Sequence, residues 1–232
     1  GPNSRAILQD LFPQLDLSNE GFPFMGVREA KLGAFPARIF RISFSGELAY
    51  EIAVPAGYGE AAWERCLAVG ETHGLVPYGL EALNILRIEK GHVTVAEIDG
   101  RVSAADLGFG KMMSSKKRFI GDALSTREGM DDPGRPTLVG LTPVDGKTKI
   151  RAGSILVEDP KTPPPVPKLG HVSSTAPISP NVGHPISLGL LKDGPNRIGD
   201  TVWAVFPLKG EAVQVKVTSP NVYDVEGARL HG

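Results

Sequence analysis

The chain has 232 residues, with 25 lysines and arginines against 26 aspartates and glutamates, so its formal net charge at pH 7 is −1. This balance argues against a nucleic-acid-binding surface or a polybasic membrane patch, because both need an excess of positive charge. The composition is that of a globular protein, and no apolar run reaches the roughly 20 residues of a membrane-spanning helix. The single cysteine, Cys66, excludes an intramolecular disulfide and favours a reducing, cytoplasmic compartment.

The amino-terminal part of the chain predicts a helix, a strand and then a β-hairpin. The helix is expected over residues 5–12, and strand character follows over residues 22–31. Polar and apolar residues alternate over 37–45, and a second run over 48–54 has strand character as well. Because a glycine-first pair separates the two runs, we expect a two-residue turn at 46–47.

Two candidate functional groups follow from this region. In the predicted hairpin, Phe44 and Glu51 project from one face, where a carboxylate among apolar side chains needs a partner or a ligand. Helices are expected over 57–70 and 78–90, and the second is apolar around most of its circumference, as in a buried helix. Arg87 lies on its apolar stripe and needs an acceptor there. A buried ion pair between Glu51 and Arg87 is the structural alternative to a binding site.

The composition of the chain changes near residues 128–136, a stretch rich in glycine and proline that is the best linker candidate. Beyond it we expect six strands, over residues 138–141, 154–157, 170–174, 186–191, 201–206 and 213–217. Short strands separated by regular turn signals predict a small barrel or sandwich. The expected fold is therefore α+β with two domains, residues 1–133 and residues 134–232, and with helices almost confined to the first.

Other motifs point to no further chemistry. The five histidines show no metal-ligand spacing, so we expect no metal site. Gly108 and Gly110 form only a fragment of the glycine-rich dinucleotide pattern. The cationic run 116–118 is interpreted as a solvated turn, with a patch for a polyanionic ligand as the alternative. Cys66 lies on the apolar side of a predicted helix and is expected to be a packed thiol.

Three motifs resemble the aminomethyltransferase, or glycine-cleavage T-protein, family. Residues 42–52 (ISFSGELAYEI) resemble its signature S-[YF]-[TS]-G-E-x-[GA]-[YF]-E-[IL], and residues 1–5 (GPNSR) look like the segment before it. Residues 78–91 (YGLEALNILRIEKG) resemble its G-x-x-A-x-x-x-L-R-[LI]-E-x-G helix. Within that family, four further stretches are similar to the carboxyl-terminal region of heterotetrameric sarcosine oxidase alpha subunits: residues 89–101, 105–108, 194–199 and 226–232.

The resemblance implies a partial aminomethyltransferase-like, folate-binding α+β region followed by a small carboxyl-terminal β-barrel. It implies tetrahydrofolate as the cofactor, which captures the one-carbon unit of oxidised sarcosine as 5,10-methylene-tetrahydrofolate. Flavin and NAD are expected only in other parts of the full enzyme. By resemblance, Phe44 stacks near the pterin, Glu51 accepts hydrogen bonds from its ring nitrogens, and Arg87 lies near the folate tail. The family often has tyrosine where this chain has Phe44.

The family also has a large upstream half, which carries the aspartate of its folate chemistry, so no catalytic residue is assigned in this chain. We therefore expect a piece of a longer polypeptide, with exposed apolar surface, self-association and no activity when isolated. The expected partners are the remainder of the alpha subunit, the other sarcosine oxidase subunits and folate, with neither nucleic acid nor membrane.

Three alternatives stay open: a glycine-cleavage aminomethyltransferase, a dimethylglycine-oxidising relative and a non-catalytic structural fragment. A folate-dependent relative that modifies RNA or assembles iron–sulfur clusters is disfavoured. Such a relative would carry a K-G-C-x-x-G-Q-E motif, whereas Lys90 and Gly91 are followed here by His92.

Overall fold

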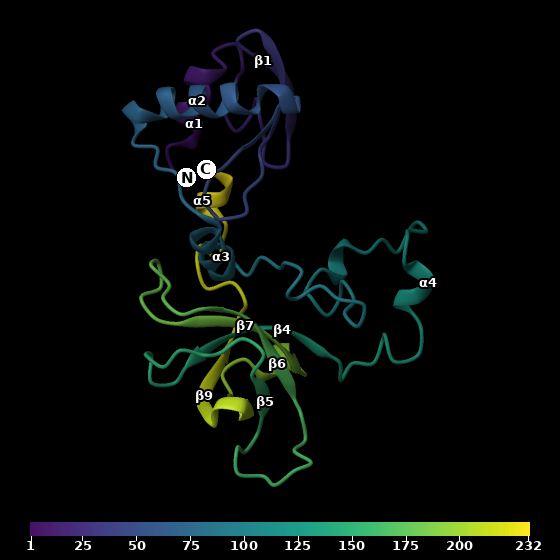
Figure 1. Ribbon diagram of the computed structural model, residues 1–232. Coiled ribbons are helices and arrows are strands. Elements are labelled where there is room, and N and C mark those ends of the chain that lie inside the picture. Colours follow the sequence, from purple (N-terminus) through teal and green to yellow (C-terminus); the bar gives the residue numbers. More distant parts are fainter. The chain divides into compact units, whose positions relative to one another are not determined.

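The computed structural model describes residues 1–232, which divide into two compact units. The amino-terminal unit comprises residues 1–86 and 224–232, and the barrel unit comprises residues 87–223. Both ends of the chain thus belong to one unit, and Figure 1 shows them beside α5 (Ala228–His231). None of the helices combines the length and the apolar character needed to cross a membrane.

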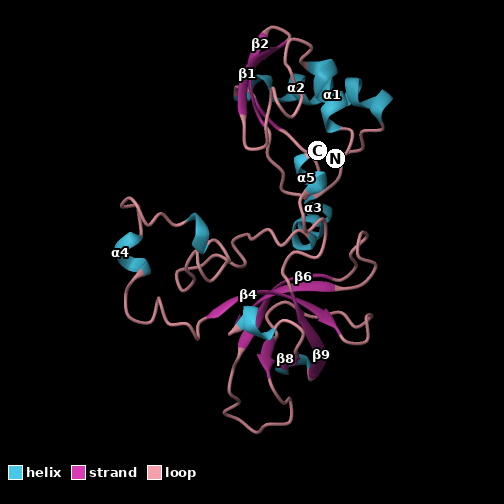
Figure 2. Cartoon of the chain, turned by 180° about the vertical axis from the view of Figure 1, so that it is seen from behind, coloured by secondary structure: helices cyan, strands magenta, loops and turns pink.

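The amino-terminal unit packs helices against a small antiparallel sheet of strand order β1-β2-β3. Its elements are α1 (Ser4–Leu11), β1 (Val27–Leu32), β2 (Phe35–Phe40), β3 (Glu51–Ala53), the 3₁₀ turns η1 (Ala56–Tyr58) and η2 (Glu71–His73), and α2 (Gly59–Gly70). Figure 2 shows α1 and α2 to one side of the β1–β2 ribbon. Apolar side chains from the helices, the sheet and the connection between them form one core, which includes Leu8, Phe12, Leu17, Phe22, Leu32 and Ile39. The predicted helices 5–12 and 57–70 are therefore confirmed.

The predicted two-residue hairpin is wrong. Strand β2 ends at Phe40, which pairs with Glu51 at the start of β3, so residues 41–50 form a longer connection. The next residue, Arg41, has a buried side chain, whose Nη1 donates to the carbonyl oxygen of Phe22 at 2.5 Å. The backbone N–H of Arg41 also donates to a carbonyl before β1, at Gly26. The prediction that Phe44 and Glu51 share one face of a two-residue hairpin is therefore wrong as well, because the pairing on which it depends is not formed.

Helix α3 (Leu80–Glu89) runs across the division between the two units, and its burial differs from the expectation. We expected a buried helix, but only its last three residues are buried, and Leu80 at its start is 83% exposed. Val76 and Tyr78, just before the helix, are 75% and 59% exposed. Such a run of exposed apolar side chains agrees with the exposed apolar surface that we expected of a piece of a longer polypeptide. Self-association through it stays a prediction.

The barrel unit is a closed antiparallel barrel of six strands in the order β4-β7-β6-β5-β8-β9. The strands are β4 (Pro136–Pro143), β5 (Ile155–Val157), β6 (Gly170–Ala176), β7 (Ile186–Lys192), β8 (Thr201–Phe206) and β9 (Glu211–Thr218), with 3₁₀ turns η4 (Gly194–Arg197) and η5 (Pro207–Lys209). Each predicted strand coincides with one of these six, so the expected barrel is confirmed. Side chains from all six strands fill its interior, among them Leu141, Leu156, Val172, Leu191, Val202 and Val215. The proline run 161–167 lies outside the strands, as expected of residues that lack the ladder donor.

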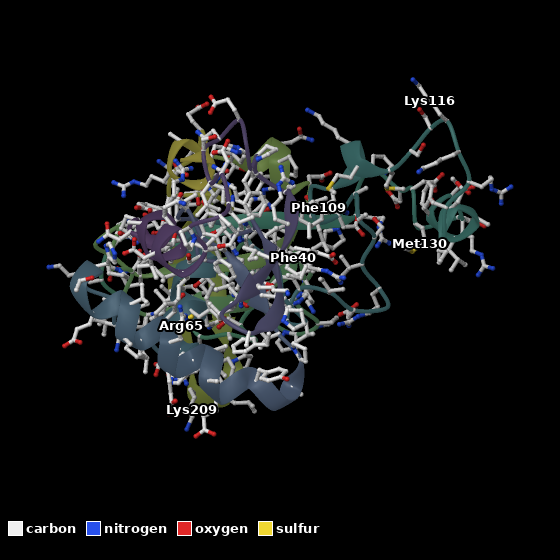
Figure 3. The ribbon with its side chains drawn as sticks, turned by 90° about the horizontal axis from the view of Figure 1, so that it is seen from above. Phe40, Arg65, Phe109, Lys116, Met130 and Lys209 are labelled. Carbon is white, nitrogen blue, oxygen red and sulfur yellow. The ribbon has the colours of Figure 1, made fainter.

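An irregular segment, residues 90–135, connects α3 to the barrel and carries η3 (Gly110–Met112) and α4 (Asp122–Ser125). It belongs to the barrel unit, to which it is joined by a hydrogen bond from the Leu138 N–H to the carbonyl oxygen of Asp106 at 2.7 Å. Figure 3 shows Lys116 at the outer end of this segment, with its side chain pointing away. The domain boundary at residues 133 and 134 followed the change in composition. This boundary stays a prediction, because the division into two compact units does not test it.

Candidate functional site

Two of the expected folate contacts lie in the amino-terminal unit. The Phe44 ring lies in the connection 41–50 and is 38% exposed. Glu51 is exposed at the start of β3, an edge strand of the sheet, and its side-chain carboxylate makes neither a hydrogen bond nor an ion pair. Arg87, which was considered as its ion-pair partner, belongs to the barrel unit. An exposed carboxylate at a sheet edge is an acceptor that a ligand can reach.

The connection that carries Phe44 is held by residues 1–5, the segment expected before the signature. The hydroxyl of Ser4 donates to the carbonyl oxygen of Leu48 at 2.7 Å. Arg5 Nε lies 3.5 Å from the Tyr50 hydroxyl. The two motifs are thus distant in sequence but adjacent in the fold, and the first one positions the backbone of the second.

A buried cation, Arg41, lies at the start of the same connection and shares an acceptor with Arg5. Arg41 Nη2 donates to the side-chain oxygen of Asn19 at 2.8 Å, and Arg5 Nη2 donates to the same oxygen at 2.6 Å. Burial holds the pKa of Arg41 below its usual value, and the charge of Arg5 acts in the same direction, although Tyr50 opposes it. The alternation over residues 37–45 did not indicate that Arg41 is buried, because the acceptors of its side chain come from outside the predicted hairpin.

Arg87, the third expected contact, lies in a buried network of the barrel unit. Its Nη1 is 3.0 Å from Glu97 Oε2, and the two side chains are 3% and 0% exposed. Its Nη2 donates to the Ser174 hydroxyl at 2.7 Å, and that hydroxyl donates to Glu97 Oε1 at 2.5 Å. The acceptor required by a buried guanidinium is thus Glu97, and Ser174 completes the network from β6.

The hydrogen bonds and the positive charge around Glu97 favour its ionised form although the side chain is buried. Burial acts to raise the pKa of this carboxyl group, but hydrogen bonds from Ser174 and from the Thr94 N–H, together with the charge of Arg87, outweigh it. The pKa of Glu97 therefore lies below its ordinary value. Sequence reasoning missed Glu97 and Ser174. The one available signal was the need of Arg87 for an acceptor.

The rest of the L-R-[LI]-E-x-G motif also has a structural role. Glu89 is fully buried. Its carboxylate accepts a hydrogen bond from Asn181 Nδ2 at 2.6 Å and another from the Ser179 hydroxyl. Gly91 has a φ of +73°, and a Cβ there would lie 2.8 Å from the carbonyl oxygen of Pro220. Arg87 and Glu89 therefore bind the end of α3 to segments of the barrel unit, and Gly91 allows the backbone at Pro220 to approach closely.

Comparison with known families agrees with this arrangement. The model of the GCVT N-terminal domain matches residues 1–117, which include the signature and the α3 motif. The model of the glycine cleavage T-protein C-terminal barrel domain matches residues 137–224, the six-stranded barrel.

Individual proteins with similar sequences point to the same family. The chain is 46% identical over 234 residues to the sarcosine oxidase subunit alpha of Rhizobium meliloti (strain 1021), covering 100% of this chain but 24% of that protein. It is 30% identical over 193 residues to an aminomethyltransferase of Streptomyces coelicolor, which covers 81% of this chain and 49% of the relative.

Among solved structures, the glycine cleavage system aminomethyltransferase T from Bartonella henselae superimposes with a TM-score of 0.74 at 26% identity. The match covers 93% of this chain and 55% of that one. The chain thus spans about a quarter of the sarcosine oxidase alpha subunits that it matches. Through both domain matches and this shared fold, the chain belongs to the glycine cleavage T-protein family.

Proposed function

We propose that this chain is the tetrahydrofolate-binding part of a sarcosine oxidase alpha subunit. There, the one-carbon unit of oxidised sarcosine would be captured as 5,10-methylene-tetrahydrofolate. The observation that carries the proposal is the exposed Glu51 carboxylate in the family signature, within a chain 46% identical along its whole length to such a subunit. The flavin, the NAD and the other subunits belong, in this proposal, to the remainder of a larger cytoplasmic enzyme.

The residues present fit the cofactor. A pterin has an amidine-like edge of adjacent N–H donors, and a carboxylate accepts such an edge in bidentate fashion. Glu51 offers that carboxylate from a strand edge, with no competing partner inside the protein. Phe44 offers an aromatic face that can stack on a planar ring. When bound, tetrahydrofolate supplies the nitrogens that accept the one-carbon unit, and these two side chains orient its ring.

The expected contact between Arg87 and the folate tail stays a prediction. Because its guanidinium is 3% exposed and engaged with Glu97 and Ser174, the geometry favours a positioning role, in which Arg87 holds the end of α3 in place. The main alternative activity, that of a glycine-cleavage aminomethyltransferase, is supported by the 30% identity to such an enzyme.

The proposal is tested by Glu51→Gln in the full-length enzyme. Loss of one charge-assisted hydrogen bond predicts that folate binding weakens by roughly 1.5–3 kcal/mol. Amine oxidation should continue and release formaldehyde instead of loading folate. The control is Glu60→Gln, which removes an exposed carboxylate from α2 of the same unit and should leave the folate dissociation constant unchanged. An unchanged constant in Glu51→Gln would end the assignment, and a lowered melting temperature alone would make Glu51 structural.

A further inference from the structure

The barrel unit contains a cavity that the proposed folate contacts do not use. Its volume is about 310 Å³, at the lower end of the range for small-molecule sites. It lies where the segment 99–102 meets the start of β6 and the neighbouring strand β7, where His171 pairs with Leu190. The lining combines apolar and charged side chains and is formed by Asp99, Arg101, Val102, Arg135, Pro136, Lys168, Leu169, Gly170, His171 and Leu190.

The charged side chains of this lining favour an anion. Arg101 is paired with Asp99, and Arg135 is paired with Asp106 just outside the lining, so the positive charge of Lys168 is left without a counter-charge. Lys168 is exposed and makes neither a hydrogen bond nor an ion pair. Arg101 uses Nε and Nη2 to bind Asp99, at 3.2 and 2.6 Å from Oδ2, while its Nη1 takes part in none of these bonds. Both cations therefore keep N–H donors for a ligand.

The third cation, Arg135, gives the cavity a fixed wall. Its Nη2 lies 2.6 Å from Asp106 Oδ2, and the carboxylate is 5% exposed. The same Nη2 donates to the carbonyl oxygen of Arg101 at 2.6 Å. Arg135 thus ties the segment that carries Arg101 to the start of the barrel, so that the cavity is shaped before a ligand arrives. Preorganisation of this kind reduces the entropic cost of binding.

We propose that this cavity is a second binding site, which takes a small carboxylate with an apolar body. The carboxylate would meet Lys168 and Arg101 at the mouth, and the apolar body would lie against Val102, Leu169 and Leu190. The site lies wholly within the barrel unit. It is independent of the folate proposal, because Phe44 and Glu51 take no part in it.

The pKa of His171 should change when a ligand binds in this cavity. Burial, followed by the charges of Lys168 and Arg101, holds the pKa of this half-buried imidazole below its ordinary value of 6.5. Asp99 and Glu97 act in the opposite direction. A bound carboxylate adds negative charge beside the imidazole and so raises its pKa. By linkage, the anion must then bind more tightly as the pH falls through the pKa that His171 has in the complex.

The test is an NMR titration of the histidine C2–H resonances in the full chain, with the signal of His171 assigned by its loss in His171→Asn. Benzoate, which has a carboxylate and an apolar ring, should raise the pKa of His171 and bind more tightly at the lower pH. Lys168→Gln should weaken benzoate binding about threefold to tenfold, as expected for one lost hydrogen-bonded contact. Lys209→Gln, which removes an exposed charge from η5 of the same unit (labelled in Figure 3), should change nothing.

Two further probes separate the parts of the proposal. Benzamide has the same ring without the charge, and inorganic phosphate has charge without the ring, so both should bind more weakly than benzoate. Equal binding of benzamide would refute the anion site, and equal binding of phosphate would refute the apolar body. If tens of millimolar benzoate leave His171 unshifted, the cavity is no binding site. None of these outcomes alters the test of Glu51.

Discussion

Replacement of Glu97 by glutamine tests whether the buried charge network stabilises the barrel unit. Glutamine has nearly the same shape as glutamate, so the change removes a charge without creating a cavity. Glu97 Oε2 lies 3.0 Å from Arg87 Nη1, and both side chains are almost fully buried. In the variant, the Arg87 guanidinium therefore stays buried without a counter-charge.

The expected loss follows from what remains in the variant. Removal of one partner of a buried ion pair costs about 3–5 kcal/mol, because the other charge is left uncompensated. Glutamine keeps one acceptor oxygen, which can still receive the Ser174 hydroxyl or the Thr94 N–H that Glu97 binds at 2.5 and 2.9 Å. We therefore expect the lower end of that range, about 3 kcal/mol in the free energy of unfolding.

Urea unfolding followed by tryptophan fluorescence measures this loss in the correct unit. Trp203 lies on β8 of the barrel, and Trp63 lies on α2 of the amino-terminal unit, so a Trp63→Phe background leaves Trp203 as the reporter. Glu211→Gln is the matched control, because it removes a carboxylate from an exposed ion pair with Arg151 of the same barrel. Exposed pairs contribute little, so this variant should unfold like the wild type. Equal losses in the two glutamine variants would refute the reasoning.

The pH dependence gives the same test a second readout. The folded-state pKa of Glu97 is depressed, so its contribution to stability is fully present above the unfolded-state pKa and is lost as the pH falls through the folded-state value. Glutamine cannot titrate. The stability difference between the wild type and Glu97→Gln should therefore be largest near neutral pH and should shrink below about pH 4.5, the ordinary value for this carboxyl group. A difference that is constant across this range would contradict the assignment.

Three further substitutions address packing and backbone. Leu156→Ala, at a fully buried position in the barrel, should cost about 2–5 kcal/mol in urea unfolding, and a smaller loss would mean that the barrel interior collapses around the change. Gly91→Ala should lower the melting temperature, because of its positive φ and the approach of Pro220, whereas Gly100→Ala, with open space around it, should not. Asp106→Asn should weaken the anchor of the linking segment and speed amide hydrogen exchange there, and unchanged exchange would show that the anchor is dispensable.

The sequence by itself determined the local elements of this protein. The six barrel strands were predicted because short β-rich runs end at glycine, proline and asparagine, which act through the backbone of their own neighbourhood. The same holds for α1 and α2. The strand order β4-β7-β6-β5-β8-β9 was not predicted, because pairing depends on which edges meet after the chain has closed on itself.

The tertiary structure alone decided the partners of the buried charges. Alternation predicted strands on both sides of the turn at residues 46–47, but β2 ends at Phe40, and the acceptor of the Arg41 side chain lies outside the predicted hairpin. The need of Arg87 for an acceptor could be stated from the sequence, yet one of its partners, Ser174, lies 87 residues away. A charged group in a low-dielectric interior binds whichever complementary group the fold brings within hydrogen-bond distance, and only the assembled chain specifies that distance.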